Sequence, residues 1–280
     1  MRILITGSKG QLGRELARAL EGNELLPFDR PEMDIQDPGA IQAILDTKSE
    51  VVIHAAALTD VDACELDPER AYRVNVTGTR HVAEAASRLG ARLVYISTDY
   101  VFDGSKQEPY TEEDRPNPIN VYGRSKLEGE RSALSYAPAP LIVRTAWVYG
   151  VGTRNFVTEI LRLARVNRVL HVVDDQVGSP TWARDLAGVI RALIRLGASG
   201  IIHATGRGEC SRFEFARAIV AMSTLATQVV PTTSDRYPRP ARRPAYCPLA
   251  QHRLNQLGLS LPDWAESLKE YLAALGGAPA

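Results

Sequence analysis

The stretch RILITGSKGQLG, residues 2–13, joins a short aliphatic run to a turn with three glycines. Arg2–Thr6 is short and almost uniformly apolar, which is typical of a strand buried in a parallel sheet. Gly7, Gly10 and Gly13 would let backbone N–H groups approach a pyrophosphate at the N-terminus of the following helix. Because the spacing is G-x-x-G-x-x-G and not G-x-G-x-x-G, a plain strand-to-helix turn is the alternative interpretation.

Strand-like and helix-like segments alternate through the first half of the chain. Gln11–Glu21 has helical spacing and ends before a glycine, and Asp37-Pro38 and Asp67-Pro68 each place a capping Asp before a Pro. The helix after Asp67 is expected to reach Gly90. This repetition predicts an α/β fold with right-handed crossovers, a Rossmann-type doubly wound parallel sheet. Its further strands are expected at Leu25–Asp29, Val51–Ala57, Leu93–Ser97 and Leu141–Thr145.

The character of the sequence changes after about residue 205. Ser211–Ser223 has helical spacing, whereas Pro231–Pro248 contains five prolines and is expected to be irregular, with two short helices after it. We therefore expect a dinucleotide-binding domain of residues 1–146 and roughly 166–205. A smaller C-terminal substrate-binding lobe would hold residues 206–280 and roughly 147–165.

The composition excludes several classes of protein. The 280 residues include 33 basic and 33 acidic side chains, and this zero net charge argues against nucleic-acid binding, which normally shows as a basic excess. No uncharged apolar stretch approaches the ~20 residues of a membrane span, and the apolar start is too short for a signal peptide. Cys64, Cys210 and Cys247 are odd in number and far apart, so we expect reduced thiols and a cytoplasmic protein.

Polar and small residues follow the predicted strands at the edge where a dinucleotide lies in such folds. Asp29 would accept a hydrogen bond from the 2′-hydroxyl of an adenosine ribose, whereas the adjacent Arg30 would meet a 2′-phosphate. NADH and NADPH therefore both stay open. Asp34, Ile35 and the run Ala55–Ala57 are expected on the same rim, although the alanines could equally be close-packed strand residues.

Tyr122 and Lys126 form a Y-x-x-x-K pair, and residues four apart share one face of a helix. A free tyrosine has a pKa of about 10, and a neighbouring cation is expected to lower that pKa and make Tyr122 a usable acid or base. Thr98 follows a predicted strand, where its hydroxyl could orient a substrate carbonyl. The pair alone arises often by chance, but its combination with the glycine turn and Thr98 indicates proton transfer beside a dinucleotide.

In these motifs the chain resembles the extended short-chain dehydrogenase/reductases. More narrowly, it is similar to the dTDP-4-dehydrorhamnose reductase family, and this resemblance spans nearly the whole chain. The last three of the motifs that carry it are the most specific: STDYVF (97–102), VYGRSK (121–126), RTAWVYG (144–150), DQVGSPT (175–181) and PARRP (240–244).

The resemblance implies a Rossmann domain, a nucleotide-sugar lobe and the reduction of a 4-keto-deoxysugar. It makes Thr98, Tyr122 and Lys126 catalytic, and it places Thr98, Tyr122, Asp99 and Trp147 against the sugar. Together with the glycine turn and the rim, the expected cofactor contacts are Gly7, Gly10, Gln11, Leu12, Gly13, Asp29, Asp34, Ile35, Ala55, Ala56, Ala57, Thr59, Tyr122 and Lys126.

A metal is a weaker expectation. Some family members hold Mg²⁺ between two subunits with acidic side chains. Glu15 is present here, but Arg184 stands where a later Glu is expected. We therefore predict no metal ligands, and we leave Mg²⁺ and a homodimer as open possibilities.

Other conspicuous residues have a functional and a structural interpretation. Trp147 follows a strand and is expected at the pocket rim, with the core as its alternative. Arg243, in the rigid PARRP segment, is expected to bind a diphosphate, with a solvated turn as its alternative. Asn75 and the five histidines are expected to be structural, and Cys64 to be unreactive.

The sequence thus supports the hypothesis of NAD(P)H-dependent reduction of the C4 ketone of dTDP-4-dehydro-L-rhamnose, with Tyr122 as proton donor. A nucleotide-sugar epimerase or dehydratase on the same scaffold, or a non-catalytic NADP-binding regulatory subunit, are the alternatives. The nucleotide of the substrate and the oligomeric state stay undetermined at this stage.

Overall fold

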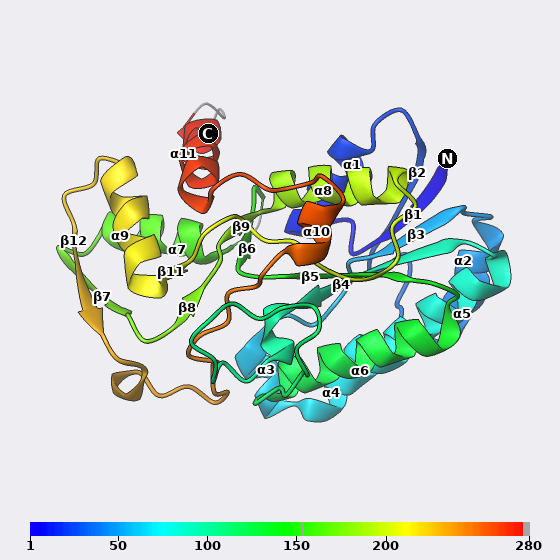
Figure 1. The fold of residues 1–280 in the computed structure, drawn as a ribbon, viewed down its shortest axis with the longest axis horizontal. Helices are drawn as coiled ribbons and strands as arrows, with labels where there is room; N and C mark the ends of the chain where they lie inside the picture. The colour runs from blue at the N-terminus through cyan, green and yellow to red at the C-terminus, as the bar shows by residue number, and fades with distance from the viewer. Residues whose placement is uncertain (153, 277–280) are drawn as a thin grey trace.

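Six parallel strands form the central sheet of this computed structural model, which describes residues 1–152 and 154–276. Their order is β10-β5-β4-β3-β1-β2, so the direction of winding reverses between β1 and β3 (Figure 1). Such a reversal opens a crevice at the carboxyl ends of the strands. The predicted doubly wound sheet is confirmed, with strands β1 (Arg2–Thr6), β2 (Glu24–Phe28), β3 (Val51–His54), β4 (Arg92–Thr98), β5 (Leu141–Thr145) and β10 (Gly200–His203).

Helices cover both faces of this sheet (Figure 1). On one face, Ile3 and Ile5 of β1 pack with α1 (Gln11–Ala19) and α8 (Ala183–Arg195). On the other face, Leu4 lies in a second core with residues of three helices. Because side chains alternate across a strand, neighbouring residues serve opposite cores. The three helices of the second core are α2 (Gly39–Asp46), α5 (Thr79–Leu89) and α6 (Val121–Tyr136).

The segment expected as one helix from Asp67 to Gly90 is helical throughout, but its middle turns are wider. Asp67 caps α4 (Pro68–Tyr72) by accepting a hydrogen bond from the N–H of Arg70, and Gly90 ends α5 with a left-handed backbone (φ +66°). Between them η1 (Arg73–Gly78) is a π-helix. Such a widened turn is often found at functional sites. A shorter helix, α3 (Val61–Leu66), precedes this segment.

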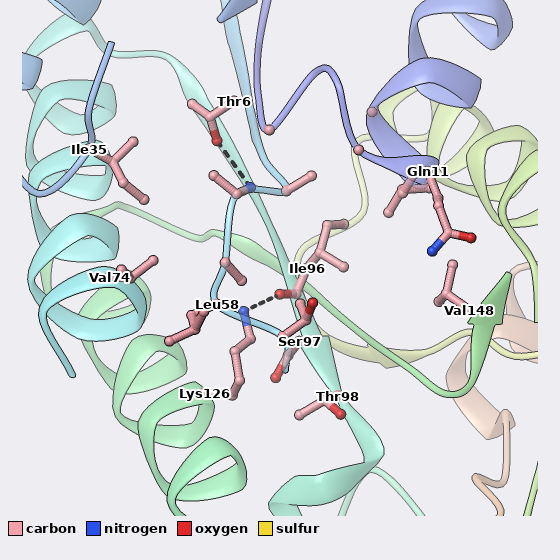
Figure 2. Close-up of a pocket in the computed structure, with 18 of the residues that line it drawn as sticks. Thr6, Gln11, Ile35, Leu58, Val74, Ile96, Ser97, Thr98, Lys126 and Val148 are labelled. Atoms are coloured by element: carbon pink, nitrogen blue, oxygen red, sulfur yellow. Dashed lines mark hydrogen bonds between the residues drawn. The ribbon is translucent and has the colours of Figure 1, made fainter. Parts of the chain in front are cut away.

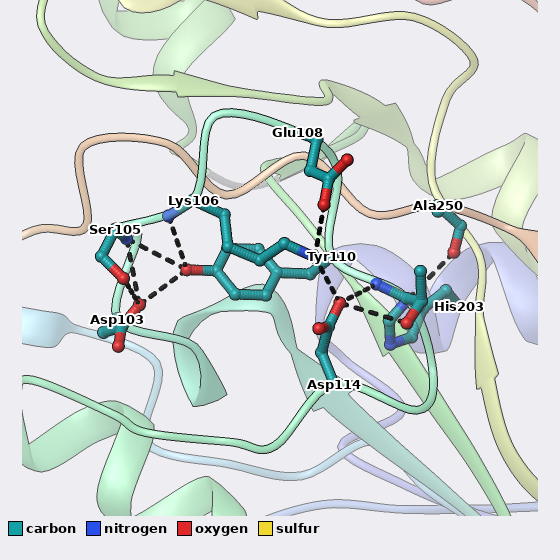
Figure 3. A network of polar contacts seen from close by, with 9 residues as sticks. Asp103, Ser105, Lys106, Glu108, Tyr110, Asp114, His203 and Ala250 are labelled. Atoms are coloured by element: carbon teal, nitrogen blue, oxygen red, sulfur yellow. Dashed lines mark hydrogen bonds and ion pairs between the residues drawn. The ribbon is translucent and has the colours of Figure 1, made fainter.

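A polar network fixes the loop between β4 and α6 (Figure 3). Tyr110 Oη donates to Asp103 Oδ1 at 2.6 Å, and Lys106 Nζ lies 2.8 Å from Asp114 Oδ2. The backbone of Tyr110 also pairs with the C-terminal segment, because its N–H donates to the carbonyl of Pro248. The loop, which begins after η2 (Asp99–Val101), therefore fixes how the end of β4 faces the start of α6.

The C-terminal lobe has its own hydrophobic core. Its helices are α7 (Phe156–Ala164), α9 (Arg212–Met222) and α11 (Trp264–Gly276), with α10 (His252–Gln256) and η3 (Ser234–Arg236) in the connections. Its short strands pair as β7 (Val169–Val173) with β12 (Gln228–Thr232), β8 (Val177–Gly178) with β11 (Cys210–Ser211), and β6 (Val148–Tyr149) with β9 (Thr181–Trp182).

The pairing of β7 with β12 bears on the boundary expected near residue 166. This pairing places residues 169–173 with the C-terminal lobe, whereas α8 and β10 pack with the main sheet. We therefore propose that the lobe takes residues 147–182, 206–246 and 262–276. Residues 183–205 and 247–261 return to the first domain, since Leu254 and Leu261 pack in the core of α1 and α8. Residues 153 and 277–280 of the expected lobe lie outside the described residues. Within the described part of the chain, no helix combines the length and apolar character that crossing a membrane requires.

Helix α6 lies against the β4 region with no space for side chains at two of its glycines. A Cβ on Gly123 would lie 2.0 Å from the carbonyl oxygen of Tyr100, and one on Gly129 would lie 2.2 Å from the hydroxyl oxygen of Tyr95. Both distances are far below van der Waals contact. The positions of Tyr122 and Lys126 are consequently set by this close contact.

Replacing Gly129→Ala should therefore destabilise the protein, since overpacking a dense core costs about 1–3 kcal/mol. Gly188→Ala is the matched control: it also lies within a helix, but no atom lies within 4 Å of its added Cβ. That control should be neutral or more stable by up to about 1 kcal/mol, because alanine favours helix. Urea unfolding of both variants measures the difference, and equal free energies of unfolding would contradict the close packing of α6.

Candidate active site

A cavity of about 670 Å³ lies at the carboxyl ends of the sheet strands. Figure 2 shows Gln11 and Val148 on one side of it and Lys126 and Val74 on the other. Of the residues predicted to be catalytic or to contact cofactor or substrate, all but Arg243 line it. They are Gly7, Gly10, Gln11, Leu12, Gly13, Asp29, Asp34, Ile35, Ala55, Ala56, Ala57, Thr59, Thr98, Asp99, Tyr122, Lys126 and Trp147.

The glycine turn has the tight geometry expected of a phosphate-binding loop. Gly7 has a left-handed backbone (φ +71°), and a Cβ there would lie 2.7 Å from the nitrogen of Ala56. A Cβ on Gly13 would lie 2.2 Å from the carbonyl oxygen of Gly7. Helix α1 begins after Gly10 without a side-chain cap, so N–H groups of its first turn are open to a ligand. These features fit a dinucleotide pyrophosphate.

Asp29 also stabilises this turn. Its carboxylate accepts hydrogen bonds from the N–H of Lys9 and the N–H of Arg30, both at 2.9 Å. Lys9 Nζ donates to the carbonyl of Arg30 and to Glu32, and both Asp29 and Arg30 line the cavity. The residues present thus fit an adenosine ribose with or without a 2′-phosphate.

The rim after β3 is supported by a buried amide. Leu58 N–H donates to Asn75 Oδ1 at 2.8 Å, and Asn75 Nδ2 donates to the carbonyl of Leu58 and to Ser125 Oγ. Because Asn75 belongs to η1 and Ser125 to α6, this residue connects three segments of the cavity wall. The predicted structural role of Asn75 is confirmed.

Lys126 reaches from α6 to β4 (Figure 2). Its Nζ donates to the carbonyl of Ile96 at 2.7 Å and lies 4.1 Å from the centre of the Tyr95 ring. Burial lowers the pKa of Lys126 to about 7, and the negative charge of Glu130 opposes this shift. Lys126 is therefore only partly charged near neutral pH.

The prediction that Lys126 lowers the pKa of Tyr122 is wrong for the protein without ligands. Burial raises the pKa of Tyr122 above its ordinary value, although the hydroxyl of Thr98 acts in the opposite direction. The cost of placing a phenolate in this apolar environment outweighs the effect of a lysine whose own charge burial disfavours. Tyr122 consequently holds its proton at neutral pH.

Thr98 and Asp99 form a hydrogen-bonded pair at the end of β4. Thr98 Oγ1 donates to Asp99 Oδ1 at 2.9 Å and accepts from the N–H of Tyr100. The other carboxylate oxygen, Asp99 Oδ2, is buried without a hydrogen-bond partner. Burial raises the pKa of Asp99 to about 7. An unpaired buried acceptor of this kind suits a hydroxyl group of a ligand.

Trp147 and Arg243 differ in their relation to the cavity. Trp147 lines it, as expected, and has an unusual left-handed backbone (φ +45°). Arg243 instead pairs with Asp62, with N–O distances of 2.5 and 2.8 Å, and hydrogen bonding to Arg243 lowers the pKa of Asp62 to about 2.

Two arginines of the cavity wall, Arg70 and Arg154, were not singled out from the sequence. Arg70 follows the capping residue Asp67 on α4, and Arg154 precedes α7. Neither belongs to a recognisable motif, so only the tertiary structure brings them to the cleft.

The residues expected near a shared Mg²⁺ ion do not fit a metal site. Glu15 pairs with Arg18 at 2.7 Å, and Arg184 pairs with Glu270. Among residues 1–152 and 154–276, no group of three or more His, Cys, Asp or Glu side chains could hold a metal ion. Burial raises the pKa of Cys64 to about 11, which agrees with its predicted lack of reactivity.

Comparison with known proteins gives a family model and a relative that both match nearly the whole chain. The family model described as the RmlD substrate binding domain matches residues 1–276. The dTDP-4-dehydrorhamnose reductase of Mycolicibacterium smegmatis is 43% identical over 284 residues, covering 99% of this chain and 86% of that protein.

Two solved structures agree with this similarity. A dTDP-4-dehydrorhamnose reductase from Clostridium acetobutylicum superposes with a TM-score of 0.97 and 43% identity, covering 99% of this chain and 100% of that one. The corresponding protein from Bacillus anthracis, solved in complex with NADP, has a TM-score of 0.95 and 38% identity, covering 98% and 99%.

The structure also makes a prediction about a buried ion pair next to Lys126 on α6. Glu130 accepts from Arg144 Nε at 2.8 Å and Nη2 at 2.7 Å, and both side chains are 2% exposed. Ser97 Oγ donates to the same carboxylate. Glu130→Ala should cost about 3–5 kcal/mol of unfolding free energy, because it leaves the charge of Arg144 buried and unpaired.

Glu128→Ala is the control for this experiment, since Glu128 lies on the same helix and pairs with Arg131 at the surface. Such a surface pair contributes about 0–1 kcal/mol. Denaturant unfolding of the two variants would refute the prediction if Glu130→Ala lost no more stability than Glu128→Ala.

Proposed function

Because this chain belongs to the RmlD substrate binding domain family, whose members include dTDP-4-dehydrorhamnose reductases, we propose that it reduces the C4 ketone of dTDP-4-dehydro-L-rhamnose to dTDP-L-rhamnose. Its cofactor is NADPH or NADH, since a relative binds NADP and the cavity offers both Asp29 and Arg30. The substrate is a nucleotide sugar, and the three free cysteines, all buried, are compatible with a cytoplasmic enzyme.

One observation carries this proposal. Helix α6 packs closely on β4, so one cavity is lined by Thr98, Tyr122 and Lys126. The glycine turn is part of the same cavity wall. Proton-transfer groups and a pyrophosphate site in one crevice suit hydride transfer to a ketone. A non-catalytic regulatory subunit would have no need of these three side chains.

The turn from Gly7 to Gly13 would hold the pyrophosphate, with Asp29 at the adenosine ribose and Ala57 and Thr59 along the rim. The bound NADPH or NADH supplies a hydride for the carbonyl carbon and is oxidised. The protein contributes position, and holding the two reactants together removes much of the entropic barrier.

Tyr122 delivers the proton to the ketone oxygen as that oxygen gains negative charge. The phenol is protonated at neutral pH, which is the state that an acid requires, although burial raises its pKa and so weakens it as an acid. Lys126, one turn along α6, then stabilises the phenolate that proton donation leaves. Solvent returns the proton to Tyr122 before the next cycle.

Thr98 and the sugar-contacting residues orient the substrate. The hydroxyl of Thr98 turns from Asp99 Oδ1 to the ketone oxygen, which it polarises. Asp99 Oδ2 accepts from a sugar hydroxyl, and the indole of Trp147 packs against the sugar.

Tyr122→Phe tests the mechanism. General acid catalysis typically contributes about 10²–10⁴-fold, so kcat with dTDP-4-dehydro-L-rhamnose should fall by that factor. The affinity for NADPH, measured by nucleotide fluorescence, should stay unchanged. Loss of reduced-nicotinamide absorbance gives the rate, and near-normal turnover in this variant would defeat the proposal.

Tyr136→Phe is the matched control, because Tyr136 ends the same helix and is exposed at the surface. It should keep wild-type kcat. A purified wild-type protein that carries stoichiometric NAD⁺ and fails to oxidise NADPH with this substrate would instead favour an epimerase or dehydratase.

A further inference from the structure

Arg212 belongs to the C-terminal lobe, and its positively charged side chain contacts a residue of the cavity wall. It is the first residue of α9, where Ser211 caps the helix by accepting from the N–H of Glu214. Its guanidinium carbon lies 3.4 Å from the centre of the Trp147 ring and 4.9 Å from that of Phe156. A planar guanidinium at such a distance is attracted to the aromatic face.

The position of the Trp147 side chain depends on contacts with its neighbours. Its left-handed backbone (φ +45°) is disfavoured for a bulky residue, so surrounding contacts must hold it. Gly178 provides one, because a Cβ there would lie 2.5 Å from Cε2 of the indole. Arg212 provides another. The aromatic surface expected to meet the sugar is thus supported from the C-terminal lobe.

Arg212 also influences Asp99. Its charge opposes the effect of burial on the pKa of that carboxyl group, and it acts on Tyr100 in the same way. Asp99 also interacts with the hydroxyl of Thr98, the phenols of Tyr100 and Tyr122 and the thiol of Cys247. Among the described residues, Arg212 is a cation whose charge acts on Asp99. It therefore favours the ionised form of Asp99, which can accept from a sugar hydroxyl.

We propose that Arg212 is a positioning residue for the sugar: its guanidinium, stacked on the indole, holds Trp147 in place for the sugar. This inference rests on the proposed reduction of a nucleotide sugar. Arg212 itself is not among the residues that line the cavity, so it acts through Trp147. Its effect should fall on substrate binding and leave cofactor binding intact.

Arg212→Met and Arg212→Lys separate the effect of the planar guanidinium from that of its charge. The Met variant loses both, whereas the Lys variant keeps the charge. Arg217→Met is the matched control, because Arg217 lies on the same helix with its guanidinium 5.4 Å from the Phe213 ring but is exposed. Steady-state kinetics with dTDP-4-dehydro-L-rhamnose and NADPH, the affinity for NADPH and the urea unfolding midpoint are measured for each.

The Met variant should raise KM for the sugar nucleotide about tenfold, the range expected for a lost desolvated cation–π contact, with a smaller change in kcat. NADPH affinity should match the wild type throughout.

The possible failures are distinguishable. If the wild type oxidises NADPH with the sugar nucleotide, but Arg212→Met has the same KM for that substrate as Arg217→Met, the inference is overturned and the proposed function stands. If the wild type itself does not turn over, both are overturned. Should the Met variant unfold, the Lys variant decides: a KM equal to that of the wild type would contradict the stacking role.

Discussion

Helix α6 approaches β4 so closely that neither Gly123 nor Gly129 has space for a single methyl group, and the site depends on this contact. At this separation Lys126 reaches the carbonyl of Ile96, and Glu130 reaches Ser97 and Arg144. If α6 were displaced by the width of a methyl group, these hydrogen bonds would be lost. The same displacement would separate Tyr122 from Thr98, so core packing and the position of the proposed proton donor are one constraint.

Burial has opposite effects on the two members of the Y-x-x-x-K pair, and both effects favour the neutral form. The pKa of Tyr122 is raised, and that of Lys126 is lowered to about 7. A neutral phenol is the form that gives a proton to a ketone, so this environment suits reduction. The nearby charge of Glu130 keeps part of the positive charge on Lys126, and that charge becomes important once the phenol has lost its proton.

The local patterns of the sequence predicted the sheet, the glycine turn and the cap at Asp67, because each depends on neighbours a few positions away. Several residues that line the cavity, such as Asp99 and Trp147, were predicted from the family resemblance instead. Features that depend on distant partners were not predicted. The π-helix at Arg73–Gly78 lies where Gly78 meets Ile35, and β7 joins the C-terminal lobe through β12. The pairing of Arg243 with Asp62 on another segment is a further contact of this kind. Likewise, no motif marked Arg212.

The central claim is that this crevice transfers a hydride from a reduced dinucleotide to a sugar ketone. The most direct measurement uses NADPH deuterated at both positions of its nicotinamide C4, dTDP-4-dehydro-L-rhamnose as acceptor, and mass spectrometry of the sugar product. The account predicts dTDP-L-rhamnose with one deuterium, bonded to C4 of the sugar. A reduced sugar that carries no deuterium, or a sugar that is recovered unreduced, would contradict it.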